Sequence, residues 1–103
     1  MARKSLDLLT ESMFYVLMTL LREERCGTEI TADVERRTGG RLKIGPGTLY
    51  TILAKFEEVG YIEETRVEGR KRTYRITPSG RGSYREELER LRQCIRDAEK
   101  EEF

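Results

Sequence analysis

Residues 45–60 read GPGTLYTILAKFEEVG, which is the pattern of a helix with both ends marked. Pro46 suits the first helical position, where a missing N–H costs nothing, and Gly60 stands where a left-handed C-terminal cap falls. Between them, apolar residues recur at helical spacing and form one stripe, made of Leu49, Ile52, Leu53, Phe56 and Val59. The opposite side is small and polar. A DNA recognition helix has this form, although an ordinary amphipathic helix with a solvated outer face shows the same pattern.

The distribution of charge favours the first interpretation. The 103-residue chain has a formal net charge of only +1, but its charges are segregated along the sequence. Residues 36–56 hold five basic side chains and no acidic one, and residues 61–82 hold six basic side chains against three acidic ones. A basic middle between acidic ends is typical of a protein with one surface that faces nucleic acid; chance clustering in a charge-rich sequence is the alternative.

Composition excludes several classes of protein. With 37% apolar and 38% charged residues, the chain has room for one small core, and a partner is expected to cover part of its apolar surface. No cleavage pattern follows Arg3, and the apolar run from Met13 to Met18 is too short to span a membrane, so we expect a cytoplasmic protein with no membrane partner. Cys26 and Cys94 lack a Cys-x-x-Cys partner, which favours structural thiols over redox sensors.

Two helices are predicted before residues 45–60. The first covers about residues 11–24, with Thr10 as its N-cap, and is apolar on almost every side. A helix of this kind needs cover on two faces, which we expect to be the core and a second subunit. A central helix enclosed within one chain is the alternative.

The second predicted helix completes a helix-turn-helix order. Cys26-Gly27 is expected to close the first helix, and Thr28 to cap a second one that runs to about Arg37. Gly39-Gly40 would end it, and residues 41–44 would form a short strand or an extended link. The turn before residues 45–60 is therefore enlarged relative to a simple helix-turn-helix motif.

A basic hairpin is predicted after Gly60. Two β-prone runs flank Glu68-Gly69, and basic residues crowd the tip and the return strand. Tyr74 and Ile76 alternate with Arg75, which gives that strand an inner and an outer face. A hairpin directly after a recognition helix is the wing of a winged helix, and basic wings lie along the DNA backbone or in the minor groove. The expected fold is thus mainly α with a small β-hairpin (α+β).

The last predicted element is a long charged helix over about residues 79–101. Its apolar positions form a heptad seam of Tyr84, Leu88, Leu91, Ile95 and Ala98. Two heptads are too few for an independent coiled coil. We therefore expect the seam to pack on the first helix of a partner subunit, at Phe14, Leu17 and Leu21; folding back onto its own domain is the alternative. Residues 1–78 would form a winged helix-turn-helix domain, its N-terminal helix shared with the dimer interface, and residues 79–103 a dimerisation helix.

Taken in order, these motifs resemble the PadR family of transcriptional regulators in its short form, over nearly the whole chain. The residues that carry the resemblance are Leu9-Thr10-Glu11, Gly27-Thr28-Glu29-Ile30, Gly47-Thr48-Leu49-Tyr50-Thr51-Ile52-Leu53 with Phe56-Glu57 and Gly60-Tyr61-Ile62, and Gly69-Arg70-Lys71-Arg72-Thr73-Tyr74-Arg75-Ile76-Thr77 with Gly80.

The resemblance implies a homodimeric repressor that binds double-stranded DNA and is released by a small-molecule effector at or near the dimer interface. Because such a dimer is twofold, its operator should be an inverted repeat. By position, the DNA contacts implied for the recognition helix, the preceding connector and the wing are Thr48, Tyr50, Thr51, Lys55, Lys43, Arg70, Lys71 and Arg72.

An enzyme has little support in this sequence. The chain has no histidine for general-base catalysis, no Gly-rich phosphate loop and no nucleophile motif, so we expect no catalytic residue, cofactor or metal site. The alternative function is a winged-helix protein–protein interaction module without sequence-specific DNA binding. The basic wing and the acid-free run over residues 36–56 favour DNA.

Overall fold

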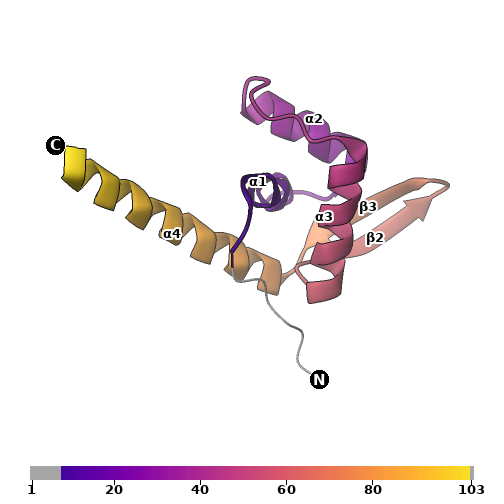
Figure 1. Cartoon of the computed structure of the whole chain (residues 1–103). Helices are drawn as coiled ribbons and strands as arrows, with labels where there is room; N and C mark the ends of the chain where they lie inside the picture. The colour runs from indigo at the N-terminus through magenta and orange to yellow at the C-terminus, as the bar shows by residue number, and fades with distance from the viewer. Residues whose placement is uncertain (1–7, 103) are drawn as a thin grey trace.

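The computed structural model describes residues 8–102, which form four helices and a three-stranded antiparallel sheet. The predicted fold class, mainly α with a small β element, is confirmed. The elements in chain order are α1 (Glu11–Thr19), β1 (Arg25–Cys26), α2 (Gly27–Arg37), α3 (Pro46–Val59), β2 (Ile62–Glu68), β3 (Lys71–Ile76) and α4 (Pro78–Glu102). Figure 1 shows α1 near the centre, the β2–β3 hairpin projecting on one side and α4 running away on the other.

The core lies where α1, α2 and α3 meet the sheet. The five members of the predicted α3 stripe are all buried, and Phe56 is completely inaccessible. Both predicted ends of α3 are also confirmed. Pro46 occupies the first turn, and Gly60 adopts the left-handed conformation with φ 82°, which is accessible to glycine at little cost.

Helix α1 is shorter than predicted, because it ends at Thr19 and not near residue 24. The hydroxyl of Thr19 donates to the Val16 carbonyl at 2.7 Å, and the Arg25 guanidinium donates to the Thr19 carbonyl at 2.7 Å. These bonds satisfy acceptors at the end of the helix and let the chain bend. The apolar sequence continues past the helix because Leu20, at the bend, is still buried in the core.

The start of α2 also differs from the prediction. Cys26 was expected to close the first helix, but it is the N-cap of α2 and a member of β1, and Thr28 lies inside the helix. The Cys26 N–H donates to the Glu29 carboxylate at 2.8 Å, an arrangement typical of a capping box, and this bond lowers the pKa of Glu29. A glutamate at the third helical position therefore fixes the start of the helix two residues earlier than the threonine suggested.

The predicted hairpin belongs to a sheet with strand order β1-β3-β2. Strand β1 pairs antiparallel with β3 at Tyr74 and Thr73, so the short segment before α2 holds the base of the wing. Glu68 pairs with Lys71, which places the two-residue loop at Gly69-Arg70, one residue later than predicted. Gly69 has φ 63°, as a tight hairpin loop requires.

A tight joint connects α3, β3 and α4. The Thr77 hydroxyl donates to the Gly60 carbonyl at 2.6 Å and accepts from the Gly80 N–H at 3.1 Å. A Cβ added at Gly80 would lie 2.1 Å from the Tyr61 carbonyl oxygen, so the first turn of α4 approaches the end of α3 too closely for a side chain. The joint therefore fixes the start of α4 relative to the end of α3.

Helix α4 leaves the body of the molecule beyond this joint (Figure 1). Every residue from Arg92 to Glu102 is exposed. Within residues 8–102, no helix combines the length and the apolar character needed to span a membrane.

Candidate nucleic-acid interface

The polar face of α3 is open to solvent, as the sequence pattern predicted. Thr48, Tyr50, Thr51 and Lys55 are exposed, and Tyr50 keeps 76% of its surface accessible. The Thr51 hydroxyl donates to the Gly47 carbonyl at 3.1 Å, and its lone pairs remain available as acceptors. This face offers hydroxyls, a phenol and an ammonium group, which are groups that hydrogen-bond to base edges and phosphates.

The ammonium group of Lys55 is only weakly engaged. Its Nζ lies 3.7 Å from the Glu58 carboxylate, and both side chains are exposed. Exposed ion pairs of this kind contribute little to stability, so a phosphate can replace the carboxylate at small cost.

Two unpaired cations lie at the tip of the wing. The side chains of Arg70 and Lys71 are exposed, and neither forms a side-chain hydrogen bond or an ion pair within 4 Å with any residue in the range 8–102, although the charge of Lys71 acts at longer range on Glu29. The other wing arginines are paired within the hairpin: Arg66 with Glu68 at 3.0 Å, Arg72 with Glu64 at 2.8 Å and Arg75 with Glu63 at 2.5 Å. The tip therefore presents positive charge that the protein itself does not neutralise.

The connector before α3 carries cations that are paired on the surface. Lys43, a predicted DNA contact, is exposed and lies 3.8 Å from the Glu35 carboxylate of α2. Arg41 forms a 3.0 Å bond to Glu11 of α1, and this bond raises the pKa of the guanidinium. The connector is thus tied to both preceding helices.

A different arrangement surrounds Asp33, a buried carboxylate on α2. It accepts a hydrogen bond from Arg36 and a 2.6 Å bond from Arg37, and Arg25 of β1 lies 3.7 Å away. Burial alone would raise the pKa of Asp33, but the hydrogen bonds from Arg37 and Arg36, together with the charges of Arg37 and Arg25, lower it. Two of the five cations in the acid-free run are therefore held by an acid one turn earlier in the sequence.

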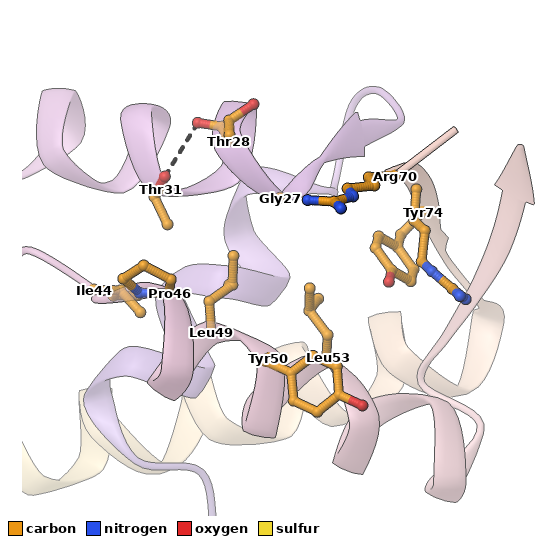
Figure 2. A pocket seen from close by; sticks show the side chains of 11 residues that line it. Gly27, Thr28, Thr31, Ile44, Pro46, Leu49, Tyr50, Leu53, Arg70 and Tyr74 are labelled. Atoms are coloured by element: carbon orange, nitrogen blue, oxygen red, sulfur yellow. Dashed lines mark hydrogen bonds between the residues drawn. The ribbon is translucent and has the colours of Figure 1, made fainter. Parts of the chain in front are cut away.

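A cavity of about 430 Å³ opens between the first turn of α2, the flank of α3 and the wing (Figure 2). It brings together three of the predicted DNA contacts, Tyr50, Arg70 and Arg72. It also includes residues that were not among the predicted site residues, namely Gly27, Thr28, Thr31, Ile44, Pro46, Leu49, Leu53 and Tyr74. In the sequence, the only indication of this cavity was the position of Thr28 at the start of the second helix of a helix-turn-helix.

Tyr74 forms the wing side of this cavity. Burial raises the pKa of its phenol, with a smaller contribution from the nearby charge of Glu57. The phenol therefore stays protonated at neutral pH and keeps its capacity to donate a hydrogen bond.

The predicted interface residues are divided between the core and the surface. Phe14 and Leu17 are buried in their own chain, and Tyr84 stacks on Phe14 with ring centroids 4.8 Å apart. Tyr84, like Leu21, Leu88 and Leu91, is partly buried against the core. The first half of the seam therefore contacts the same chain, as in the alternative of a helix that folds back on its own domain, and packing of the seam on a partner subunit stays a prediction.

Only the distal part of the seam is uncovered in this chain. Ile95 keeps 58% of its surface accessible, and Ala98 is also exposed. These two residues form the part of the seam that a second chain can cover.

Comparison with known proteins assigns the family. The sequence model of the transcriptional regulator PadR-like family matches residues 16–86, which is more than half of the chain. The chain belongs to the PadR-like family of transcriptional regulators. The matched region runs from α1 to the first half of α4 and includes the whole wing, and the resemblance noted in the sequence is confirmed.

The chain is also similar to individual known proteins. A transcriptional regulator from Clostridium thermocellum has 30% sequence identity and a TM-score of 0.77, covering 85% of this chain and 89% of its own. The DNA-binding protein TubR of Clostridium botulinum C phage is 29% identical over 66 residues, which are 64% of this chain and 82% of TubR. An uncharacterized 37.1 kDa protein in a Streptomyces fradiae transposon is 36% identical over 71 residues, 69% of this chain but only 20% of that protein.

Proposed function

We propose that this PadR-like protein is a repressor that binds an inverted-repeat DNA operator as a homodimer and is released by a small-molecule effector. The observation that carries the proposal is the exposed polar face of α3 beside the unpaired cations Arg70 and Lys71. The similarity of this chain to TubR, a DNA-binding protein, and to the C. thermocellum regulator supports the proposal. A role on chromosomal DNA would place the protein in the cytoplasm.

The two parts of the interface have different tasks in this proposal. Helix α3 enters the major groove, where Thr48, Thr51 and Lys55 contact base edges and adjacent phosphates. The wing tip holds the backbone through Arg70 and Lys71, with Arg72 and Lys43 contributing after they exchange their surface carboxylates for phosphates. The α3 contacts select the sequence, and the wing contacts add affinity for any duplex.

The dimer in this proposal uses the distal half of α4. Ile95 and Ala98 continue the apolar seam beyond the point where the chain's own core covers it. A second copy that packs its α1–α4 surface on this segment would remove the apolar area from water. Residues 1–78 then act as the DNA-binding domain and residues 79–103 as the dimerisation helix.

The rigid joint between α3 and α4 could couple an effector at the dimer interface to the release of DNA. Thr77 and Gly80 fix the first turn of α4 to Gly60 and Tyr61 at the end of α3. A ligand that changes the angle between the α4 helices of a dimer would therefore change the separation of the two α3 helices. Half-sites one helical turn apart tolerate little change in that separation.

Fluorescence anisotropy against the protein's own upstream DNA tests the central part of the proposal. The native duplex and a scrambled duplex of equal length are titrated at several salt concentrations. We expect tighter binding to the native duplex and a steep loss of affinity with salt, because basic side chains displace counterions from phosphates. An absence of binding to either duplex at low salt would contradict the proposal and favour a protein-interaction module.

The dimer is tested separately with Ile95→Glu, which places a charge in the exposed part of the seam. Gln93→Glu is the matched control, because Gln93 is also exposed on α4 but lies on the opposite side of the helix. Sedimentation of wild type and Gln93→Glu should give a dimer, and Ile95→Glu should shift toward monomer. A dimer of unchanged stability in Ile95→Glu would contradict this interface.

A further inference from the structure

We propose that the cavity between α2, α3 and the wing binds a small amphipathic organic anion, and that this ligand competes with DNA. The site is separate from the dimer interface and lies within the DNA-binding surface itself. Binding of the anion stands on its own, whereas the competition rests on the proposed function.

The floor of the cavity is apolar and favours a ligand with an apolar part. Ile44, Leu49 and Leu53 lie at the bottom, and each has less than a tenth of its surface exposed. Pro46 and the ring of Tyr74 extend the apolar wall on two sides. A volume of about 430 Å³ is within the range of sites that enclose small molecules, and a bare phosphate would leave this apolar lining in contact with water.

The rim of the cavity is positively charged at Arg70 and favours a ligand with one negative charge. Arg70 has no ion-pair partner among residues 8–102, and Figure 2 shows its side chain reaching from the wing toward Gly27 at the start of α2. Arg72 also lines the cavity, but Glu64 already neutralises it at 2.8 Å. The N-terminal end of α2, an 11-residue helix, adds a favourable dipole on the opposite wall; Thr28 and Thr31 line this wall, and the Thr31 hydroxyl donates to the Thr28 carbonyl at 3.1 Å (Figure 2).

The position of the cavity makes the ligand and DNA mutually exclusive. Tyr50 and Leu53 belong to the flank of α3 that faces the wing, and Arg70 belongs to the wing tip. When α3 lies in the major groove and the wing contacts the backbone, the strand between these two contacts passes over the cavity. An anion held by Arg70 would occupy that path and would engage a cation that the phosphate needs.

The test uses 8-anilinonaphthalene-1-sulfonate, an aromatic sulfonate whose fluorescence rises in apolar sites, with the full-length protein and no DNA. Octanoate should displace the probe, and 1-octanol, which has the same chain length but no charge, should displace it far less. Arg70→Gln should weaken probe binding about tenfold, since it removes a charge-assisted hydrogen bond. Lys71→Gln is the matched control, because it removes the same charge from the adjacent position outside the cavity lining.

A second variant, Thr31→Trp, tests the location of the site. It fills the cavity from a surface position on α2 without altering a core residue, and it should abolish the octanoate-sensitive fluorescence. Circular dichroism confirms that the variants are folded. Equal probe affinity in Arg70→Gln and Lys71→Gln, or octanoate-sensitive binding retained in Thr31→Trp, would overturn the proposal.

Competition is measured afterwards, by adding octanoate to the protein–DNA complex in the anisotropy assay. We expect octanoate to release DNA from wild type at the concentrations that displace the probe, and 1-octanol to leave the complex intact at the same concentrations. Octanoate binding without release of DNA would overturn the competition and leave the anion site in place. A protein that binds octanoate but no DNA would instead show that the proposed function has failed.

Discussion

Asp33 with Arg25, Arg36 and Arg37 (the Asp33 cluster) and the wing tip with Arg70 and Lys71 both contain several basic side chains, but these charges have different roles. At Asp33, three guanidinium groups surround one buried carboxylate and connect β1 to α2. At the wing tip, the side chains of Arg70 and Lys71 face solvent and form no ion pair with residues 8–102. The first arrangement stabilises the fold, whereas the second leaves charge for a partner. The number of basic residues in a segment does not distinguish the two.

This difference changes the meaning of the acid-free run over residues 36–56. All five of its cations lie within 4 Å of a carboxylate: Arg36 and Arg37 pair with Asp33 one turn earlier in α2, Lys55 pairs with Glu58 one turn later in α3, and Arg41 and Lys43 pair with acids of α1 and α2. The exposed pairs of Lys43 and Lys55 are weak and can be exchanged for phosphate. The pairs of Arg36 and Arg37 involve a buried acid and cannot be exchanged without loss of stability.

The largest effect is expected for Asp33→Asn. Removing the charge leaves the guanidinium groups of Arg25 and Arg37, both largely covered, without their partner, and should lower the free energy of unfolding by about 3 kcal/mol. Urea denaturation measures the change. Glu35→Gln on the same helix is the control, since Glu35 is half exposed and should cost less than about 1 kcal/mol. Equal effects of the two substitutions would show that the Asp33 cluster contributes no more than a surface pair.

Acid should weaken the protein partly through the same carboxylate. Although burial opposes it, the pKa of Asp33 lies below the ordinary value of 3.8, so its stabilisation is complete above that value and is lost as the pH falls through the lower folded-state pKa. The pKa values of Glu29 and Glu87 are lowered by hydrogen bonds from Cys26 and Arg90, so they add to the slope. Asp33→Asn should therefore lose less stability than wild type on acidification. If the stability of wild type and of Asp33→Asn fell equally with decreasing pH, Asp33 would not be the source of this acid sensitivity.

Lys71→Ala should leave stability unchanged and weaken DNA binding. The side chain has no ion pair to lose, and we expect a reduction in affinity of about threefold to tenfold that is similar for native and scrambled duplexes. Thermal denaturation and anisotropy on the same preparation measure both quantities. A drop in melting temperature with unchanged DNA affinity would mean that the wing tip is structural, like the Asp33 cluster.

The smallest effect on affinity is expected for Thr51→Ala. Its hydroxyl lies on the exposed polar face of α3, which we propose contacts base edges, so its loss should alter the preference between duplexes by a few-fold and leave binding to scrambled DNA unchanged. Anisotropy with single-base variants of the upstream duplex measures this preference. A uniform loss across all duplexes would instead place Thr51 at a phosphate.

The sequence predicted α3 well because its signals are local. The proline, the glycine cap and the apolar stripe all lie within residues 45–60, and the structure contains each of them as expected. Strand β1 was not predicted because its signal is not local. Two residues are too few to show an alternating pattern, and Arg25 and Cys26 form a strand only because they pair with β3. The early end of α1 has the same origin, since Arg25 binds the Thr19 carbonyl from β1.

The candidate site was predicted in part. The exposed residues of α3 and the wing tip follow from local patterns, but the cavity joins three segments that are separate in sequence, residues 27–31, 44–53 and 70–74. Two pairs that join different elements could not be predicted from the sequence, because Glu35 and Glu64 meet Lys43 and Arg72 only in the fold. The seam of α4 shows a similar limit, since an apolar stripe does not reveal which chain covers it.

The salt dependence of DNA affinity in wild type, Lys71→Ala and Arg37→Ala tests most directly whether the wing tip binds phosphates while the Asp33 cluster stabilises the fold. Each phosphate contact contributes about 0.9 to the slope of log affinity against log salt concentration. We predict that Lys71→Ala lowers the steepness by about this amount, whereas Arg37→Ala, whose cation is held by Asp33, destabilises the fold and leaves the slope unchanged. A slope that falls for Arg37→Ala and not for Lys71→Ala would contradict the proposed interface.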